Sequence, residues 1–305
     1  MKATMALVQD QPVLPVARIK KVDGTRWLQT PVYRMDRASD GRRIWLVGMV
    51  HYGLPSYYAQ TVRLVNEIRQ AGAVVLREGG GLKASLLNPA SDLTGEEREL
   101  LEVTNDYWLY HHFLACHSGR IDQSEGWKDS IEDWENVDIP IAVRNRERGD
   151  VTAQLEQMRH DLARLRWIAG NTKAIAAWRR RDNLIQYQVT VHLRHTSAED
   201  AHKMVARNRH VIDAALHRDR DVVLPWGTNH LPGFTLRLTQ AGFSTAAEQW
   251  LNAFTMPNPL WLSLRATATG LRNSMRMSGE QRRARLAAHL NSLGSTAAAD
   301  RGEDR

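Results

Sequence analysis

Four short apolar runs constrain the fold of this chain more than any other feature of its sequence. They lie at Ile44–Val50, Ala73–Leu76, Ile139–Val143 and Val222–Leu224, and segments with helical spacing separate them. A short apolar run without polar alternation is typical of a strand that is covered on both faces. The sequence therefore predicts an α/β fold with a central, mostly parallel sheet flanked by helices.

Helix signals lie between these runs. Thr94 with Glu97 forms a capping-box pattern before a long helical stretch, and Ser197 with Asp200 repeats it before a helix that reaches about residue 217. Apolar residues also recur at helical spacing over 155–165. We therefore expect a helical insertion over residues of about 80–200, between strands of the core.

The composition of the sequence changes along the chain and indicates where its segments begin and end. We expect a loosely ordered arm over residues 1–24 and the α/β domain over 25–255. A helical extension is expected over 256–294, followed by a small, charged and disordered tail over 295–305. The extension carries the apolar run Leu260–Leu262, which we expect to pack on the core or on a second copy of the chain, forming a homodimer.

The composition excludes several classes of protein. Hydrophobic residues make up 43% of the 305 residues and charged residues 25%, as in ordinary globular proteins. No apolar run is long enough to cross a bilayer, and the first residues lack a signal-peptide core, so we expect a cytoplasmic protein. The net charge of +7 is scattered along the chain, so nucleic acid is not an expected partner.

Two copies of a Gly-x-x-His pattern follow apolar runs. Gly48 and His51 end the first run, and Gly227 and His230 follow the last. Glu78 stands at the end of a third run, in VVLREGG. Because the carboxyl ends of parallel strands meet at one edge of a sheet, we expect His51, Glu78 and His230 to share that edge.

Two imidazoles and a carboxylate suit two kinds of chemistry. They can hold a catalytic divalent metal ion with an open coordination position. They can also act without a metal, with one histidine as general base and the glutamate orienting it. A third interpretation is purely structural, because histidines at strand ends often only satisfy buried hydrogen-bonding groups.

The segment MVARNRHVIDAAL predicts a helix with an apolar stripe. Asn208 falls in the middle of this stripe and Arg207 at its margin. Arg207 could reach the site and hold an anionic group or an oxyanion, or it could extend to solvent while Asn208 bonds to a neighbouring backbone group. Asp138 is expected to be a turn or cap residue. The only cysteine, Cys116, excludes an internal disulfide, and neighbouring His117 should not face it on a helix.

These motifs together resemble the TraB/GumN/Tiki family, which is related more distantly to the erythromycin esterase-like proteins. The resemblance rests on GMVHYG, VVLREGG, ARNRHVIDAAL and VVLPWGTNHLPGFTLRLTQAGF, and it covers roughly residues 40 to 250 in the family's order. The sequence departs from the family at Met49, where Ser or Thr is usual, and at Gly80 and Gly81, where a carboxylate is common.

The resemblance implies a mixed α/β core with one active centre. Some members are metal-dependent peptidases, so His51, Glu78 and His230 would hold a divalent ion such as Mn, Co or Zn. Glu78 and Arg207 would be the catalytic residues. We therefore predict a metal-dependent hydrolase that cleaves an amide bond in a peptide or small molecule. The alternatives are a metal-free ester hydrolase with His51 as general base, or a non-catalytic regulatory or binding protein.

Overall fold

A computed structural model describes residues 14–79, 93–147, 149–179, 181–182 and 198–256. The chain divides into two compact units, residues 1–256 and 257–305, and every described residue belongs to the first. Apart from Met256, the predicted helical extension and tail lie outside the described residues. The predicted homodimer stays a prediction for the same reason.

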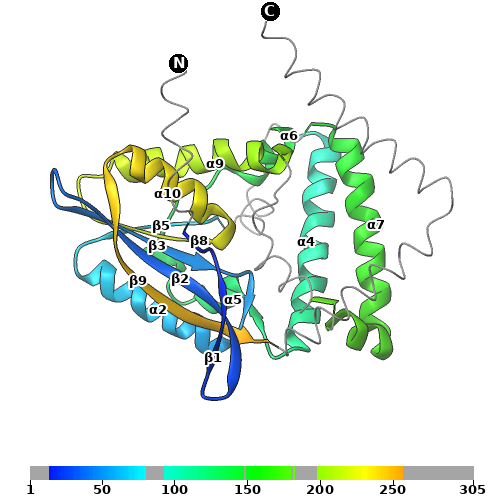
Figure 1. Cartoon of the computed structure of the whole chain (residues 1–305). Helices are drawn as coiled ribbons and strands as arrows, with labels where there is room; N and C mark the ends of the chain where they lie inside the picture. Colours follow the sequence, from blue (N-terminus) through cyan, green and yellow to red (C-terminus); the bar gives the residue numbers. More distant parts are fainter. Residues whose placement is uncertain (1–13, 80–92, 148, 180, 183–197, 257–305) are drawn as a thin grey trace, which may run out of the picture. The chain divides into compact units, whose positions relative to one another are not determined.

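One mixed sheet forms the centre of the first unit (Figure 1). Its strands are β1 (Arg18–Val22), β2 (Thr25–Arg37), β3 (Arg42–Met49), β8 (Val222–Gly227), β5 (Val74–Arg77) and β7 (Glu135–Asn136), in that order, with β9 (Phe243–Thr255) paired to β2. The pairs β3–β8, β8–β5 and β5–β7 are parallel, and the pairs that involve β2 are antiparallel. The predicted α/β fold is confirmed.

Helices cover both faces of this sheet. The described helices are α2 (Pro55–Gln70), α4 (Gly95–Cys116), α5 (Gln123–Trp127), α6 (Ile141–Glu147), α7 (Val151–Ala169), α9 (Ala198–Leu216) and α10 (Leu231–Gln240), with short 3-10 turns η1 (Ile131–Asp133) and η2 (Thr228–His230). In Figure 1, α2 lies on one face of the sheet and α9 and α10 on the other. A second sheet consists of β4 (Tyr52–Gly53) and β6 (Ile121–Asp122).

Strand β3 illustrates why the apolar runs are uninterrupted. Ile44 and Leu46 are fully buried in the cluster that contains Phe234 of α10. The alternate residues point the other way: the Met49 sulfur lies 3.6 Å from the hydroxyl of Tyr57 on α2. Side chains alternate across a strand, so a strand between two helical layers needs apolar residues at every position.

Three predictions about the order of elements need correction. The predicted strand at Ile139–Val143 is wrong: helix α6 begins at Ile141, and the strand is the preceding β7. Pro140 explains the change, because its fixed φ and missing N–H suit a helix start rather than a central strand. The insertion over about 80–200 is therefore not purely helical, since β7 joins the main sheet. Part of the predicted loose arm, residues 18–22, is strand β1.

The predicted helices agree more closely with the structure than the predicted strand at Ile139–Val143 does. Thr94 and Glu97 form the predicted capping box: the Thr94 N–H donates to Glu97 Oε2 at 2.8 Å, and the Glu97 N–H donates to Thr94 Oγ1 at 3.2 Å. The stripe over 155–165 lies in α7, which ends at Gly170. The MVARNRHVIDAAL helix is α9, although Ser197 lies outside the described residues.

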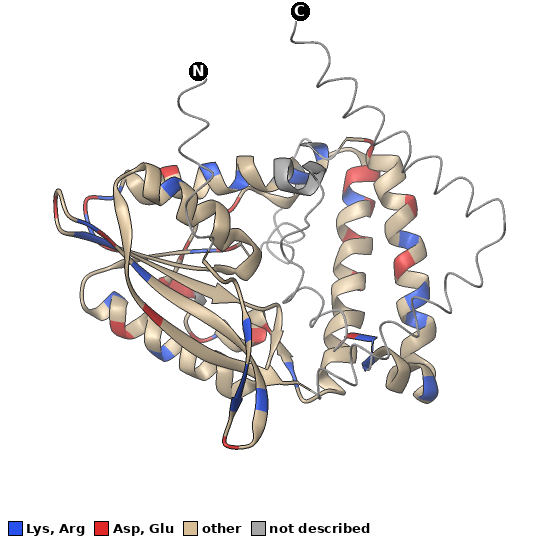
Figure 2. Ribbon diagram, in the orientation of Figure 1, with Lys and Arg blue, Asp and Glu red and all other residues tan. Residues whose placement is uncertain are grey.

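The distribution of charge and the hydropathy of the described helices agree with the predictions from the sequence. Figure 2 shows that the positions of Lys and Arg and those of Asp and Glu are spread over the described helices and strands. Many are paired across helices, as are Arg159 of α7 with Glu99 of α4, and Arg166 with Asp106 at 2.8 Å. Among the described helices, none has the length and apolar character needed to cross a membrane.

Candidate functional site

The four parallel strands bring their carboxyl ends to one edge of the sheet. In the register of β3 and β8, Gly48 pairs with Trp226 and Met49 with Gly227, so the two Gly-x-x-His motifs leave the sheet side by side. Glu78 directly follows β5, and Asp138 is the second residue after β7. Ligands of open parallel sheets usually bind at this edge.

Arg207 of α9 joins three of these strand ends. Its Nη2 donates to Glu78 Oε1 at 2.8 Å, its Nε to Asp138 Oδ1 at 2.7 Å, and its Nη1 to His230 Nε2 at 2.9 Å. Nη2 also donates to Asp138 Oδ2, which completes a bidentate ion pair. We call Glu78, Asp138, Arg207, Asn208 and His230 the Arg207 cluster.

The contacts of His230 fix its protonation. A guanidinium can only donate, so Nε2 of His230 must accept from Arg207. In the neutral ring Nδ1 then carries the hydrogen, and it faces Asn208 Oδ1 at 2.6 Å. The side-chain oxygen of Asn208 therefore accepts from a histidine ring. His230 is buried with both ring nitrogens engaged, so it has no lone pair left for a further ligand.

Glu78 is engaged on both oxygens. While Oε1 accepts from Arg207, Oε2 accepts the backbone N–H of Gly227 at 2.8 Å. A Cβ on Gly227 would lie 3.3 Å from Oε2, so the glycine of the second motif allows this close approach. The nearest oxygen of Glu78 lies 3.8 Å from His230 Nε2.

Electrostatics keep this cluster in one charge state at neutral pH. Burial alone would raise the pKa of Glu78, but the nearby charges of His230 and Arg207 outweigh it and lower that pKa to about 2. Burial lowers the pKa of His230 to about 4, against the attraction of Glu78. Glu78 is thus ionised and His230 neutral. The carboxyl groups of Glu78 and Asp138 both pair with Arg207, and Arg144 lies 4.0 Å from Asp138.

His51 lies outside this network. It follows β3 in an exposed bend, where its carbonyl accepts the backbone N–H of Gln123 at 2.9 Å. Its ring lies 5.8 Å from the ring of Trp108 on α4 and makes no hydrogen bond with any described residue. It is close enough to act electrostatically on both Glu78 and His230. The structure thus brings Glu78, Arg207 and His230 into contact and leaves His51 at the rim.

The sequence missed Asp138 as part of the site. Its side chain is 2% exposed, and besides Arg207 it accepts the backbone N–H of Gly79 at 3.2 Å. A signal was present: an acidic residue just before Ile-Pro, at the point where a strand gives way to a helix start. Because the run after Asp138 was assigned as the strand, the residue fell at the wrong strand end.

Cys116 has a partner other than its neighbour. His117 Nδ1 faces the Phe113 carbonyl oxygen, as expected for adjacent residues on a helix, while the Cys116 sulfur lies 3.6 Å from His112 Nε2. Burial and the charge of Asp122 raise the pKa of Cys116. The thiol is therefore protonated at neutral pH and is not an activated nucleophile.

The predicted metal ligands do not fit a divalent ion in this arrangement. An ion at Glu78 Oε1 and His230 Nε2 would have to displace the guanidinium that occupies both atoms. Arg207 is in turn held by the bidentate contact with Asp138. Within the described part of the chain, no group of three or more His, Cys, Asp or Glu side chains is arranged to hold a metal ion. The metal site stays a prediction.

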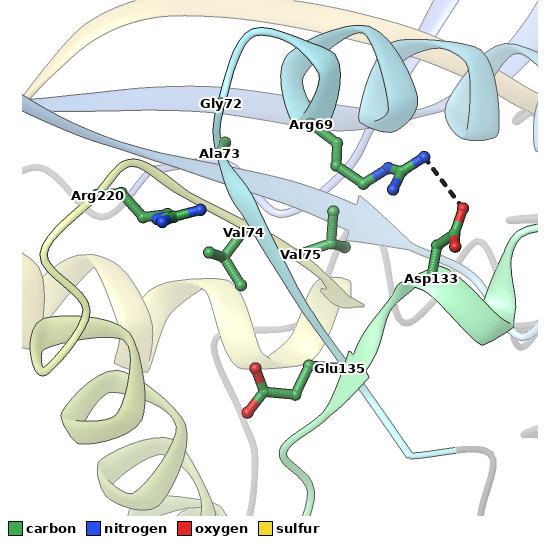
Figure 3. Close-up of a pocket in the computed structure, with 8 residues that line it drawn as sticks. All are labelled: Arg69, Gly72, Ala73, Val74, Val75, Asp133, Glu135 and Arg220. Atoms are coloured by element: carbon green, nitrogen blue, oxygen red, sulfur yellow. Dashed lines mark ion pairs between the residues drawn. The ribbon is translucent and has the colours of Figure 1, made fainter.

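A surface hollow of about 350 Å³ lies away from the Arg207 cluster (Figure 3). It is lined by residues that precede or begin β5, among them Gly72 and Val74, and by charged side chains such as Arg69 and Asp133, which pair at 3.0 Å. These residues lie at the amino end of β5, the opposite end from Glu78. The hollow is therefore separate from the candidate site.

The candidate site consequently rests on its own geometry: one buried arginine, two carboxylates and a neutral histidine, with a second histidine exposed beside them. Comparison with known proteins adds no relative, since no family model, no curated protein and no solved structure matches the chain.

Proposed function

We propose that the chain is a hydrolase that cleaves esters with His51 as its general base and without a metal ion at Glu78 and His230. One observation carries the proposal. Arg207 occupies the atoms that would bind the ion, Glu78 Oε1 and His230 Nε2, while the ring of His51 stands exposed beside them without a hydrogen bond to any described residue.

The proposed reaction uses His51 twice. A ring nitrogen of His51 accepts a proton from water as the water oxygen attacks the ester carbonyl carbon. When the tetrahedral intermediate collapses, the bond to the alcohol oxygen breaks and the proton passes from His51 to the leaving alkoxide. The carboxylate of Glu78 is near enough to interact electrostatically with His51, which places a negative charge beside the reacting ring.

Glu78 and Arg207 support this reaction indirectly. A carboxylate with a pKa near 2 is a weak base, so Glu78 suits electrostatic support better than proton abstraction. Four of the five N–H groups of Arg207 already donate within the cluster, which leaves little capacity for an oxyanion. We therefore assign Arg207 as a positioning residue that holds Glu78 in its ionised state.

The chemistry favours an ester over an amide. An alkoxide leaves a tetrahedral intermediate more readily than an amine nitrogen, which must first be protonated. A site with one exposed base and no metal ion to polarise the carbonyl suits the easier reaction. The amide hydrolysis expected from the family resemblance would need the metal ion.

The test compares His51→Ala with wild type on a panel of simple esters, with acid release followed by pH-stat titration. His210→Ala, at an exposed histidine of α9, is the matched control. We expect wild type to hydrolyse esters in the presence of a chelator, and His51→Ala to be slower by about 10²-fold or more. The urea unfolding midpoint of His51→Ala should stay that of wild type, because the side chain is exposed.

Three outcomes would overturn the proposal. Activity that a chelator removes and Mn, Co or Zn restores would favour the metal-dependent hydrolase. Full activity in His51→Ala would remove His51 as the base. Absence of hydrolysis by wild type across ester and peptide panels would favour a non-catalytic binding or regulatory protein.

A further inference from the structure

Ring side chains cluster beside His51. We call Tyr52, Tyr107, Trp108 and His111 the aromatic platform. The ring of Trp108 lies 5.8 Å from that of His51 and 6.4 Å from that of Tyr52. His111 stacks on Tyr52 at 6.2 Å, with 21° between the ring planes. The proposed base thus stands at the border of an aromatic surface.

Trp108 is the open part of this platform. It is 39% exposed, although tryptophan is usually well covered. Its indole touches Tyr107 and His111 on its own helix, at 5.7 and 5.9 Å, and the residues after β3 on its other side. An aromatic group bound next to His51 would therefore find a ring surface that is already held in place.

The platform carries no charge at neutral pH. Burial raises the pKa of Tyr52 and of Tyr107, so both phenols keep their protons. Burial lowers the pKa of His111, so its ring is neutral. An uncharged, partly exposed group of rings favours an aromatic ligand, which gains by stacking on one of them, over an aliphatic group of the same size.

Backbone pairing fixes the platform relative to His51. Tyr52 pairs with Asp122 between β4 and β6, and the Gln123 N–H donates to the His51 carbonyl at 2.9 Å. Strand β6 follows α4, the helix that carries Trp108, by a short turn. His51 and Trp108, which are 57 positions apart in sequence, are therefore tied through one small sheet.

We infer that the substrate carries an aromatic ring next to its ester group, and that this ring stacks on Trp108 while the ester carbonyl lies at His51. The inference rests on the proposed ester hydrolysis for its substrate class. Trp108 would be the residue that determines specificity. Either the acid or the alcohol side of the ester can carry the aromatic group, and the test uses the alcohol side.

The experiment compares benzyl acetate with cyclohexylmethyl acetate, which differ in aromaticity but hardly in size. We expect wild type to prefer benzyl acetate in kcat/KM by roughly 2- to 12-fold, the range of one aromatic pair. Trp108→Ala should erase that preference mainly through KM, and Trp108→Phe should restore part of it. Trp167→Ala, at a tryptophan of α7 that is 66% exposed, should behave as wild type.

Binding without turnover separates this inference from the proposed function. Saturation-transfer NMR with benzyl acetate on His51→Ala should show ring contact that disappears in the His51→Ala/Trp108→Ala double variant. That result would support the platform even if wild type hydrolysed neither ester. Equal hydrolysis of both esters by wild type and by Trp108→Ala would overturn the inference and leave the proposed function standing. Ring contact that survives in the double variant would also overturn it.

Discussion

The two Gly-x-x-His motifs have the same pattern and adjacent positions, yet their histidines have opposite environments. His230 is 5% exposed and bonded through both ring nitrogens, whereas His51 is exposed. The difference arises after the motif. Helix α10 begins at Leu231, directly after His230, while α2 begins only at Pro55, so β4 separates it from His51. The segment that follows each strand therefore determines whether its histidine is buried and hydrogen-bonded or exposed to solvent.

The largest effect should come from removing the link between the strand ends. Arg207→Ala takes the closest cation from two buried carboxylates, Glu78 and Asp138, with Arg144 left 4.0 Å from Asp138, and we expect a loss of about 3–5 kcal/mol in the free energy of unfolding. Urea unfolding followed by circular dichroism measures it. Arg209→Ala, at an exposed arginine two positions along α9, should change stability by less than about 0.5 kcal/mol. Equal values for the two variants would mean that the cluster does not stabilise the sheet edge.

The next effect compares the two histidines directly. His230→Ala removes a buried ring and leaves Asn208 Oδ1 and Arg207 Nη1 without the ring nitrogens that they contact, so we expect a loss of about 2–4 kcal/mol. His51→Ala should cost less than about 0.5 kcal/mol. Thermal unfolding of both variants tests the contrast. A lower melting temperature for His51→Ala than for His230→Ala would reverse the assignment of the two motifs.

As the pH falls, protonation of His230 should destabilise the protein before protonation of Glu78 does. The pKa of His230 is lowered from its ordinary value of 6.5 to about 4 in the folded protein. Between pH 6.5 and pH 4, this side chain is therefore protonated in the unfolded chain and neutral in the folded chain. Stability from this group is complete above pH 6.5 and is lost as the pH falls towards 4, by about 2–3 kcal/mol. Glu78, lowered from 4.5 to about 2, adds its own loss only below pH 4.5.

Urea unfolding of wild type and His230→Gln from pH 7 to 4 isolates this contribution. The variant should lose clearly less stability than wild type across that range, because its amide does not titrate. Parallel curves for the two proteins would show that other groups cause the acid sensitivity.

The smallest effect should distinguish the two glycines. A Cβ on Gly48 would lie 3.1 Å from the Pro31 carbonyl oxygen, a backbone atom that cannot easily move, whereas on Gly227 it would meet the Glu78 side chain at 3.3 Å. We expect Gly48→Ala to cost about 1–2 kcal/mol and Gly227→Ala less than about 1 kcal/mol. Melting temperatures measured together would check the order. The reverse order would mean that Glu78 is held more rigidly than the backbone of β2.

The parallel half of the fold could be predicted because its signals are local. Strands β3, β5 and β8 are covered on both faces, so each is an apolar run that stands out in the sequence. The antiparallel strands β2 and β9 gave no such signal. β2 contains Pro31 and several polar residues, and β9 is exposed over much of its length. Long-range pairing between them, and not their composition, makes them strands.

The same distinction between local and long-range signals applies to the candidate site. Glu78, Arg207 and His230 could be proposed from strand ends and a helix stripe, because each lies at a position with a local pattern. That Arg207 would occupy the prospective metal ligands could not be predicted, since it depends on how α9 packs on the sheet. Asp138 was missed because Pro140 starts a helix where the apolar residues around it suggested a strand.

The span of the Arg207 cluster has a kinetic consequence. Arg207 contacts Asp138 and Glu78, which precede it by 69 and 129 residues. Such distant contacts close large loops, so they are expected to form late, after the local helices and turns. Substitutions in the cluster should then accelerate unfolding more than they slow folding. The hydrogen-bonded arrangement of the Arg207 cluster would form only in the last step of folding, and a partly folded chain would have its histidines but not the charge arrangement around them.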